Sequence, residues 1–296
     1  MKLLTTPTSR FDTLPGYPWA MRAFRAEATA GATLAYVDEG PRDATHAFLC
    51  LHGNPTWSYL YRKMIPVFLE AGGGAVGPEM VGFGGPPQPA AGTAHTLSFH
   101  RASLAALVES LDLRRVTLVV QDWGGLFGLT LPMLAPHRYT RLLVMNTGFG
   151  TGQVTEGFRA WRSYSNGKPD LDVAALLKRS EPTLSDAEAQ AYNAPFPDVT
   201  YKAALRAFPN LVPDGDDAPG AATGREAMAW FGSQWRGQSF MAVGMKDPVM
   251  GLPAMESLRR AIPGCPEPMR IEEGGHFVQE HGERIARAAL AAWQGS

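Results

Sequence analysis

The sequence predicts an α/β protein with a mostly parallel sheet flanked by helices and an inserted α-helical cap. Short apolar runs alternate with longer segments of helical spacing, which is typical of a parallel sheet covered on both faces. The strand-like runs stop between about Thr151 and Asp216, where helical patterns take over. We therefore expect residues 1–149 and 217–296 to form the sheet-bearing core and residues 150–216 to form the cap.

Apolar runs bounded by Gly, Asn or Asp predict the strands of the core. In chain order these runs are Thr33–Gly40, His46–Gly53, a weaker one within Gly74–Gly85, Val116–Val120, Arg141–Gly148, Ser239–Asp247 and Pro268–Phe277. Helical spacing occurs at Tyr59–Gly73, Ser98–Leu113, from about Gly124 onward and at Gly282–Trp293. Within the cap, it occurs at Leu171–Arg179 and Ser185–Ala194.

The composition indicates a compact protein and gives no sign of a nucleic-acid or membrane partner. Of the 296 residues, 45% are hydrophobic and 19% charged, and the formal net charge is −1. No apolar run reaches the roughly 18 residues that a membrane span needs, and the N-terminus lacks the apolar core of a signal peptide. We expect a cytoplasmic monomer in which Cys50 and Cys265 are free, buried thiols.

Three residues that suit catalysis lie at the predicted carboxyl ends of strands: Asp122, Asp247 and His276. Ligands of open parallel sheets bind beyond these strand ends. The order acid, acid, histidine matches the nucleophile, acid and histidine order of the α/β-hydrolases. Taken singly, Asp122 also suits a helix N-cap, Asp247 a surface turn and His276 a buried core histidine.

A carboxylate at the turn after Val116–Val120 predicts displacement at a saturated carbon. Asp122 is ionised at neutral pH, so it needs no base before it attacks, and the product is an ester on its own side chain. His276 would then remove a proton from the water that hydrolyses the ester. Asp247 would orient the imidazole and stabilise its charged form.

Trp123, directly after the carboxylate, supplies one indole N–H donor and no acceptor. If it faces a pocket, this donor needs an acceptor, and a departing halide ion is a suitable one. Core packing is the alternative explanation of this tryptophan.

At this point the sequence resembles the haloalkane dehalogenases of the α/β-hydrolase fold, over about Thr33 to Trp293. The resemblance is carried by "HGNPTWSYLYRKM", "LDLRRVTLVVQDWGGLFGLTLPM", "MNTG", "APFPD", "FMAVGMKDPV" and "GGHFVQEHGE". It implies Asp122 as nucleophile, His276 as base and Asp247 as the acid partner, as in the subgroup whose catalytic acid lies late in the chain. In the other subgroup an acid stands where this chain has Asn146.

The resemblance also implies the surroundings of the triad. Trp123 and Trp161 would bind the halide, and the backbone N–H groups of Asn54 and Trp123 would form the oxyanion hole. The pocket walls would be Leu126, Phe158, Phe208, Pro209, Val212, Val249 and Met250. The partners would be a small haloalkane and a halide ion, with no cofactor and no metal.

Two departures from the family pattern matter. Asn54 stands where the late-Asp subgroup usually has Glu, so its side-chain amide is a second candidate, beside Trp161, for the second halide donor. Glu79 replaces a usual Asp in the loop after Gly74–Gly85.

Two other functions stay open at this point. Epoxide hydrolases share the Asp nucleophile and the late Asp–His pair, and they use cap tyrosines, for which Tyr164, Tyr192 and Tyr201 are available. A fold used only for binding is the other alternative, although such a protein could lose a triad member and all three are present.

Overall fold

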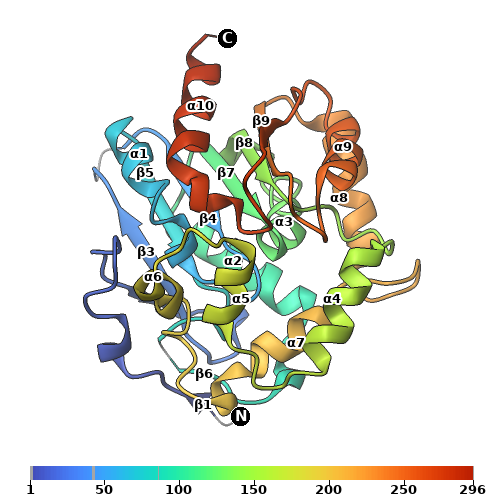
Figure 1. Cartoon of the computed structure of the whole chain (residues 1–296). Coiled ribbons are helices and arrows are strands. Elements are labelled where there is room, and N and C mark those ends of the chain that lie inside the picture. The colour runs from blue at the N-terminus through green and yellow to red at the C-terminus, as the bar shows by residue number, and fades with distance from the viewer. Residues whose placement is uncertain (1–2, 42–43, 86, 296) are drawn as a thin grey trace.

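The computed structural model describes residues 3–41, 44–85 and 87–295 and has one large sheet at its centre (Figure 1). The eight strands lie in the order β10-β9-β8-β7-β4-β5-β3-β2. Their bounds are β2 Arg22–Phe24, β3 Leu34–Glu39, β4 Ala47–Leu51, β5 Gly74–Pro78, β7 Val116–Gln121, β8 Tyr139–Met145, β9 Gln238–Gly244 and β10 Met269–Ile271. β3 pairs antiparallel with both β5 and β2, and the other neighbouring pairs are parallel. Two short strands, β1 Leu3–Leu4 and β6 Gln88–Pro89, form a separate antiparallel pair.

The middle of the sheet explains why the sequence alternates as it does. Every residue of β7 is buried, because β4 and β8 flank it and helices cover both faces. The register pairs Gln121 of β7 with Met145 of β8, and Met145 with Ala242 of β9. The carboxyl ends of these three strands therefore lie at the same edge of the sheet, where the candidate catalytic residues follow them.

Helices flank the sheet and continue beyond its carboxyl edge. Their bounds are α1 Ile65–Glu70, α2 Leu97–Ser110, α3 Trp123–Gly128, α4 Glu156–Asn166, α5 Val173–Ser180, α6 Asp186–Ala191, α7 Ala203–Leu211, α8 Ala221–Gln234, α9 Leu252–Ala261 and α10 Gly282–Gln294. Helices α4 to α7 come between β8 and β9 in the chain and lie in the lower half of Figure 1, whereas α8 packs against α9 beside the sheet.

The two ends of the α4–α7 segment meet. Gly152 forms an isolated bridge with Asp214, and the Gly215 N–H donates to the Gly152 carbonyl at 2.7 Å. Arg159 and Arg162 of α4 both form ion pairs with the Asp214 carboxylate, at 3.0 and 2.9 Å. These contacts between the two ends are consistent with a cap over residues 150–216. The domain boundaries themselves stay a prediction.

A buried ion pair joins the α4–α7 segment to the sheet-bearing part. The Arg62 guanidinium donates to both oxygens of Glu280, at 2.7 and 2.8 Å, and to Glu188 of α6 at 2.9 Å. Tyr192, which follows α6, donates its hydroxyl hydrogen to the same Glu280 carboxylate. Because the arginine fork and both carboxylates are hydrogen-bonded, the network offsets much of the cost of burying its charges.

The predicted elements agree with most of the core strands, but the prediction lacks the helices α8 and α9 and is wrong at several short elements. The strands expected from Thr33–Gly40 through Ser239–Asp247 are all present, and the closing helix is α10. The single helix expected at Tyr59–Gly73 is wrong: a 3-10 turn at Ser58–Tyr61 precedes α1, which starts with Pro66 in its first turn. The last predicted strand shortens to Met269–Ile271 because a turn follows it, and β2 was not predicted at all.

Two expectations from composition are tested within the described residues. Cys50 and Cys265 are both buried and free. None of the described helices combines the length and the apolar character that crossing a membrane requires.

A neutral acid lies under the loop that follows β4. Glu79 is buried and accepts hydrogen bonds from the Ser58 N–H and hydroxyl, yet burial outweighs these bonds and raises the pKa of Glu79 to about 8. Its neighbour His52 donates from Nδ1 to the Gly53 carbonyl at 2.8 Å and accepts the Met80 N–H at Nε2, so the ring is neutral. Burial lowers the pKa of His52 to about 4, and the contact between His52 and Glu79 at 3.4 Å therefore joins two uncharged groups near pH 7.

Replacing Glu79 by Gln should make the free energy of unfolding less dependent on pH. In the unfolded chain Glu79 loses its proton near its ordinary pKa, whereas in the folded protein it keeps the proton up to about pH 8. The contribution of protonated Glu79 to the free energy of unfolding is therefore fully present below the pKa that Glu79 has in the unfolded chain. It is lost as the pH rises to about 8, and the free energy of unfolding falls by an amount on the order of a few kcal/mol. Urea unfolding at pH 5 and pH 8 should show a smaller fall for Glu79→Gln than for the wild type. Equal falls would mean that Glu79 is ionised in the folded protein.

Candidate active site

The turn after β7 holds Asp122 in a backbone conformation that most residues avoid. Its φ is +50° and its ψ is −124°, in the positive-φ region that favours glycine. Close packing enforces the turn: a Cβ on Gly124 would lie 1.9 Å from the Leu51 carbonyl oxygen, and one on Gly53 would lie 2.3 Å from Asp122 Oδ1. The glycines of "HGNP" and "QDWGG" therefore let the ends of β4 and β7 approach closely enough to present Asp122.

The Asp122 carboxylate does not cap the helix that follows it. It makes no capping hydrogen bond to α3, and its Oδ1 instead accepts the Asn54 N–H at 2.8 Å. Within the described residues, the Trp123 backbone N–H makes no such bond to the carboxylate. One of the two expected oxyanion donors is therefore in place beside Oδ1.

His276 lies between two carboxylates. Its Nδ1 is 2.7 Å from Asp247 Oδ2, and its Nε2 is 3.4 Å from Asp122 Oδ2. Asp247 is buried and accepts the Val249 N–H at 2.7 Å, so it is not a surface-turn residue. The structure thus brings all three predicted catalytic residues into one line of contacts, Asp122, His276 and Asp247.

Charge decides the protonation of this line. Burial opposes a charged imidazole, but Asp247 and then Asp122 outweigh it and raise the pKa of His276 to about 10. Burial likewise opposes an ionised Asp247, and the attraction of His276 overcomes it and lowers the pKa of Asp247. Between these two acids, His276 therefore carries its proton at neutral pH.

Asn146 holds Asp247, a role that the sequence did not suggest. Its Nδ2 donates to Asp247 Oδ2 at 2.8 Å, and its Oδ1 accepts the Gly244 N–H at 2.8 Å. The only feature of the sequence that points to Asn146 is its position after a strand, where the other subgroup of the family has an acid. Gln121, the residue before Asp122, similarly donates to the His276 carbonyl at 2.9 Å.

A second residue that sequence reasoning missed is Glu181, at the end of α5. Its side chain is buried, and its Oε1 accepts the Gly275 N–H, directly before His276, at 2.7 Å. A Cβ on Gly275 would lie 3.0 Å from this oxygen and 2.5 Å from the Ser180 hydroxyl, so the second glycine of "GGH" lets α5 reach the histidine loop. No periodicity or motif in the sequence marks this contact.

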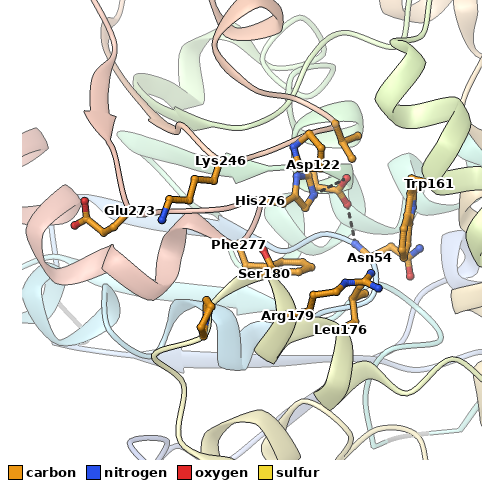
Figure 2. Close-up of a pocket in the computed structure, with 13 residues that line it drawn as sticks. Asn54, Asp122, Trp161, Leu176, Arg179, Ser180, Lys246, Glu273, His276 and Phe277 are labelled. Carbon is orange, nitrogen blue, oxygen red and sulfur yellow. Dashed lines mark hydrogen bonds and ion pairs between the residues drawn. The ribbon is translucent and has the colours of Figure 1, made fainter.

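Two cavities meet at Asp122. The outer cavity has a volume of about 360 Å³ and is shown in Figure 2; the inner cavity has a volume of about 80 Å³. Asp122 and Val249 line both. The outer cavity also contacts Asn54, Trp161, Leu176, Arg179, Ser180, Pro182, Lys246, Pro248, Glu273, His276 and Phe277.

Most of the predicted pocket walls line the inner cavity, and two do not. The wall residues found there are Leu126, Phe158, Val212, Val249 and Met250. Phe208 and Pro209 line neither cavity, which corrects the expectation for both. Phe208 is fully buried and packs behind Trp123, with ring centroids 4.8 Å apart, and Pro209 is buried within α7.

The candidate halide donors lie on the two sides of Asp122. Trp123 lines the inner cavity, and none of the hydrogen bonds among the described residues involves its indole N–H. Trp161 and Asn54 line the outer cavity, and Figure 2 draws both on the same side of Asp122. Among the described residues, the buried Asn54 Oδ1 has no hydrogen-bond partner, and Nδ2 lies 3.5 Å from the Leu205 carbonyl.

The tyrosines that an epoxide hydrolase would need are engaged elsewhere. Tyr192 is buried against Glu280, Tyr201 contacts the Thr5 carbonyl, and Tyr164 contacts Arg179. None of the three lines either cavity. A search of the described residues finds no group of three His, Cys, Asp or Glu side chains that could hold a metal.

Comparison with known proteins gives the same assignment as the geometry. Residues 46–283 match the family model of the alpha/beta hydrolase fold. A haloalkane dehalogenase of Psychrobacter cryohalolentis is 40% identical over 295 residues, covering 97% of this chain and 96% of the relative. One of Mycolicibacterium paratuberculosis is 37% identical and covers 99% of each chain. The chain belongs to the haloalkane dehalogenases.

Solved structures of this family agree. The tetrameric haloalkane dehalogenase DpaA of Paraglaciecola agarilytica superposes with a TM-score of 0.94 at 44% identity, over 98% of each chain. DbeA of Bradyrhizobium elkani gives 0.74 at 25% identity, over 93% of this chain and 97% of its own. The predicted fold and reaction class, hydrolysis of a carbon–halogen bond, are confirmed, and the epoxide hydrolase alternative is not favoured.

In this haloalkane dehalogenase, replacing Asp122 by Asn should lower the pKa of His276. The substitution removes a negative charge that lies 3.4 Å from Nε2 and helps to hold the pKa of His276 at about 10. An NMR titration of the imidazole, assigned with a His276→Gln variant, measures the change. Asp112→Asn is a control because Asp112 is an exposed acid paired with Arg114 and Arg138. An unchanged pKa in Asp122→Asn would contradict the charge coupling described here.

Proposed function

We propose that Asp122 is the nucleophile, His276 the base and Asp247 its acid partner in the hydrolysis of small haloalkanes. The observation that carries this proposal is the line of contacts from the Asp122 carboxylate through His276 to Asp247, at the meeting point of two largely apolar cavities. The products are an alcohol, a halide ion and a proton, and the reaction needs water and no cofactor.

The first step forms an ester. Asn54 holds Oδ1, so Oδ2 is the oxygen that attacks the carbon bearing the halogen. The new C–O bond forms as the carbon–halogen bond breaks, and the electron pair of that bond leaves with the halide. Exclusion of bulk water from the cavity favours this attack, since a hydrated carboxylate is a weak nucleophile.

The second step hydrolyses the ester and needs a neutral histidine. Ester formation removes the negative charge of Asp122, which lowers the pKa of His276 and releases its proton. Neutral His276 then takes a proton from water as the water oxygen attacks the ester carbonyl. Charge develops on Oδ1, where the Asn54 N–H is already placed to stabilise it. The alcohol leaves with the proton from His276. The carboxylic acid formed on Asp122 then gives its proton to His276, which restores the Asp122 carboxylate and the protonated imidazole.

The departing halide is proposed to bind between the donors on either side of Asp122. The Trp123 indole comes from the inner side, and the Trp161 indole and the Asn54 amide come from the outer side. An N–H dipole aimed at charge that develops in the transition state lowers the barrier more than it stabilises the substrate.

Two substitutions test the covalent mechanism. Asp122→Asn should lower bromide release from 1-bromobutane by about 10⁴-fold or more, because an amide cannot take the place of the attacking carboxylate. His276→Phe should instead form the ester and fail to hydrolyse it. Mass spectrometry of the peptide that contains Asp122 should then show one added butyl group.

The wild type is the positive control, and bromide and acid should be released in equal amounts. An unmodified Asp122 peptide from His276→Phe, together with undiminished bromide release, would exclude the ester intermediate. Diol formation from styrene oxide in place of bromide release would mean that cap tyrosines act in catalysis and that the protein is an epoxide hydrolase.

Bromide quenching of tryptophan fluorescence distinguishes the two outer donors. If Trp161 binds the halide, Trp161→Phe should raise the Kd for bromide by about tenfold, the effect of losing one hydrogen bond to an ion. Asn54→Ala tests the amide in the same way and leaves the backbone N–H in place. Trp230→Phe is the matched control, because Trp230 lies in α8 and packs against Phe231 of the same helix and Trp235, which directly follows it. An unchanged Kd in both variants would place the halide away from the outer donors.

Two finer expectations belong with this proposal. The relative of 44% identity is described as tetrameric, which favours an assembly over the monomer expected from the sequence. Light scattering on the purified chain decides between them. The cytoplasmic location stays a prediction.

A further inference from the structure

The lining of the outer cavity combines apolar walls with charged residues outside the triad, and we call these charged residues its rim. The apolar walls come from Trp161, Leu176, Val249 and Phe277. The rest of the lining includes three charged residues, Arg179, Lys246 and Glu273. In Figure 2, Arg179 lies on the same side as Asn54, Leu176 and Trp161, whereas Lys246 and Glu273 lie on the opposite side.

These three charges are not equally compensated. The Glu273 carboxylate pairs with Arg284 at 3.0 Å and lies 3.7 Å from His281 Nδ1. Among the described residues, neither Arg179 nor Lys246 has a carboxylate within 4.0 Å. The charge of Glu273 is therefore compensated by a nearby arginine, whereas Arg179 and Lys246 have no carboxylate in ion-pair contact among the described residues.

A phenol, not an acid, contacts Arg179. The guanidinium donates to the Tyr164 hydroxyl at 3.2 Å and lies 5.0 Å from the centre of that ring. Lys168 lies over the same ring at 4.6 Å, and hydrogen bonds from Arg179 and Lys168 lower the pKa of Tyr164. This side of the rim is therefore a region of positive charge in which a planar guanidinium keeps N–H groups free for an acceptor.

We propose that the outer cavity accepts haloalkanes that carry an anionic group, such as a carboxylate, at the end opposite the halogen, and that Arg179 binds this group. The inference rests on the proposed function, since the halogen-bearing carbon must reach Asp122. The apolar walls would contact the methylene chain between the two ends. An anionic group close to Asp122 would be repelled by that carboxylate, so the anion belongs at Arg179 and away from Asp122.

Three probes of equal chain length test the proposal: 6-bromohexanoate, 6-bromohexan-1-ol and 6-bromohexyltrimethylammonium. In the wild type, kcat/KM should be highest for the carboxylate and lowest for the ammonium. Arg179→Gln should lower the ratio of kcat/KM for carboxylate over alcohol by about twofold to fivefold, the upper part of the range for an exposed charged contact. Arg179→Lys should restore part of the ratio because it keeps the charge.

Lys168→Gln is the matched control, since it removes one positive charge beside Tyr164 from a residue that does not line the cavity. Its effect on the ratio should be smaller than that of Arg179→Gln. Equal ratios in the wild type and Arg179→Gln, or equal effects of the two variants, would overturn the proposal. If all variants release bromide from 6-bromohexan-1-ol, the dehalogenase mechanism is intact in them. If the wild type releases no bromide from this alcohol, the result contradicts the proposed function and not the role of Arg179.

Discussion

The catalytic centre depends on how closely the ends of β4 and β7 approach each other. Gly53 and Gly124 leave no room for a side chain between these strand ends, and Asp122 takes a positive φ as a result. The same approach places the Asn54 N–H on Asp122 Oδ1. One packing constraint therefore both presents the proposed nucleophile and supplies the donor that would stabilise charge on its ester. A larger residue at either glycine would separate the strands and disturb both functions together.

The carboxylates around His276 determine whether its imidazole is protonated or neutral. In the proposed mechanism, two negative charges hold a proton on His276 before the reaction, and only Asp247 remains once Asp122 is esterified. The proposed nucleophile would thus control when its own base becomes active. Asn146, Gln121 and Glu181 surround this line with hydrogen bonds to Asp247, the His276 carbonyl and the Gly275 N–H, so they fix where the imidazole lies.

Glu181 also links the two parts of the protein, because it comes from α5 and bonds the loop of His276. The buried pair of Arg62 and Glu280 makes a second link, through Glu188 to α6. Helices α4 and α5 then line the outer cavity with Trp161 and Arg179. The α4–α7 segment therefore shapes the space in which a substrate lies and contacts the loop that carries the base.

The sequence by itself determined the fold class, the long core strands and the three catalytic candidates, because these follow from local hydrophobic patterns and from residue types that follow strands. The resemblance to a family added Trp161 and the pocket walls. Only the tertiary structure decided that Phe208 lies behind Trp123, that the cavity has two parts, and that Asn146 and Glu181 hold Asp247 and the His276 loop. The physical reason is the range of the interactions: a strand or a turn depends on neighbouring residues, whereas these contacts join residues about 100 positions apart in the chain, which only packing brings together.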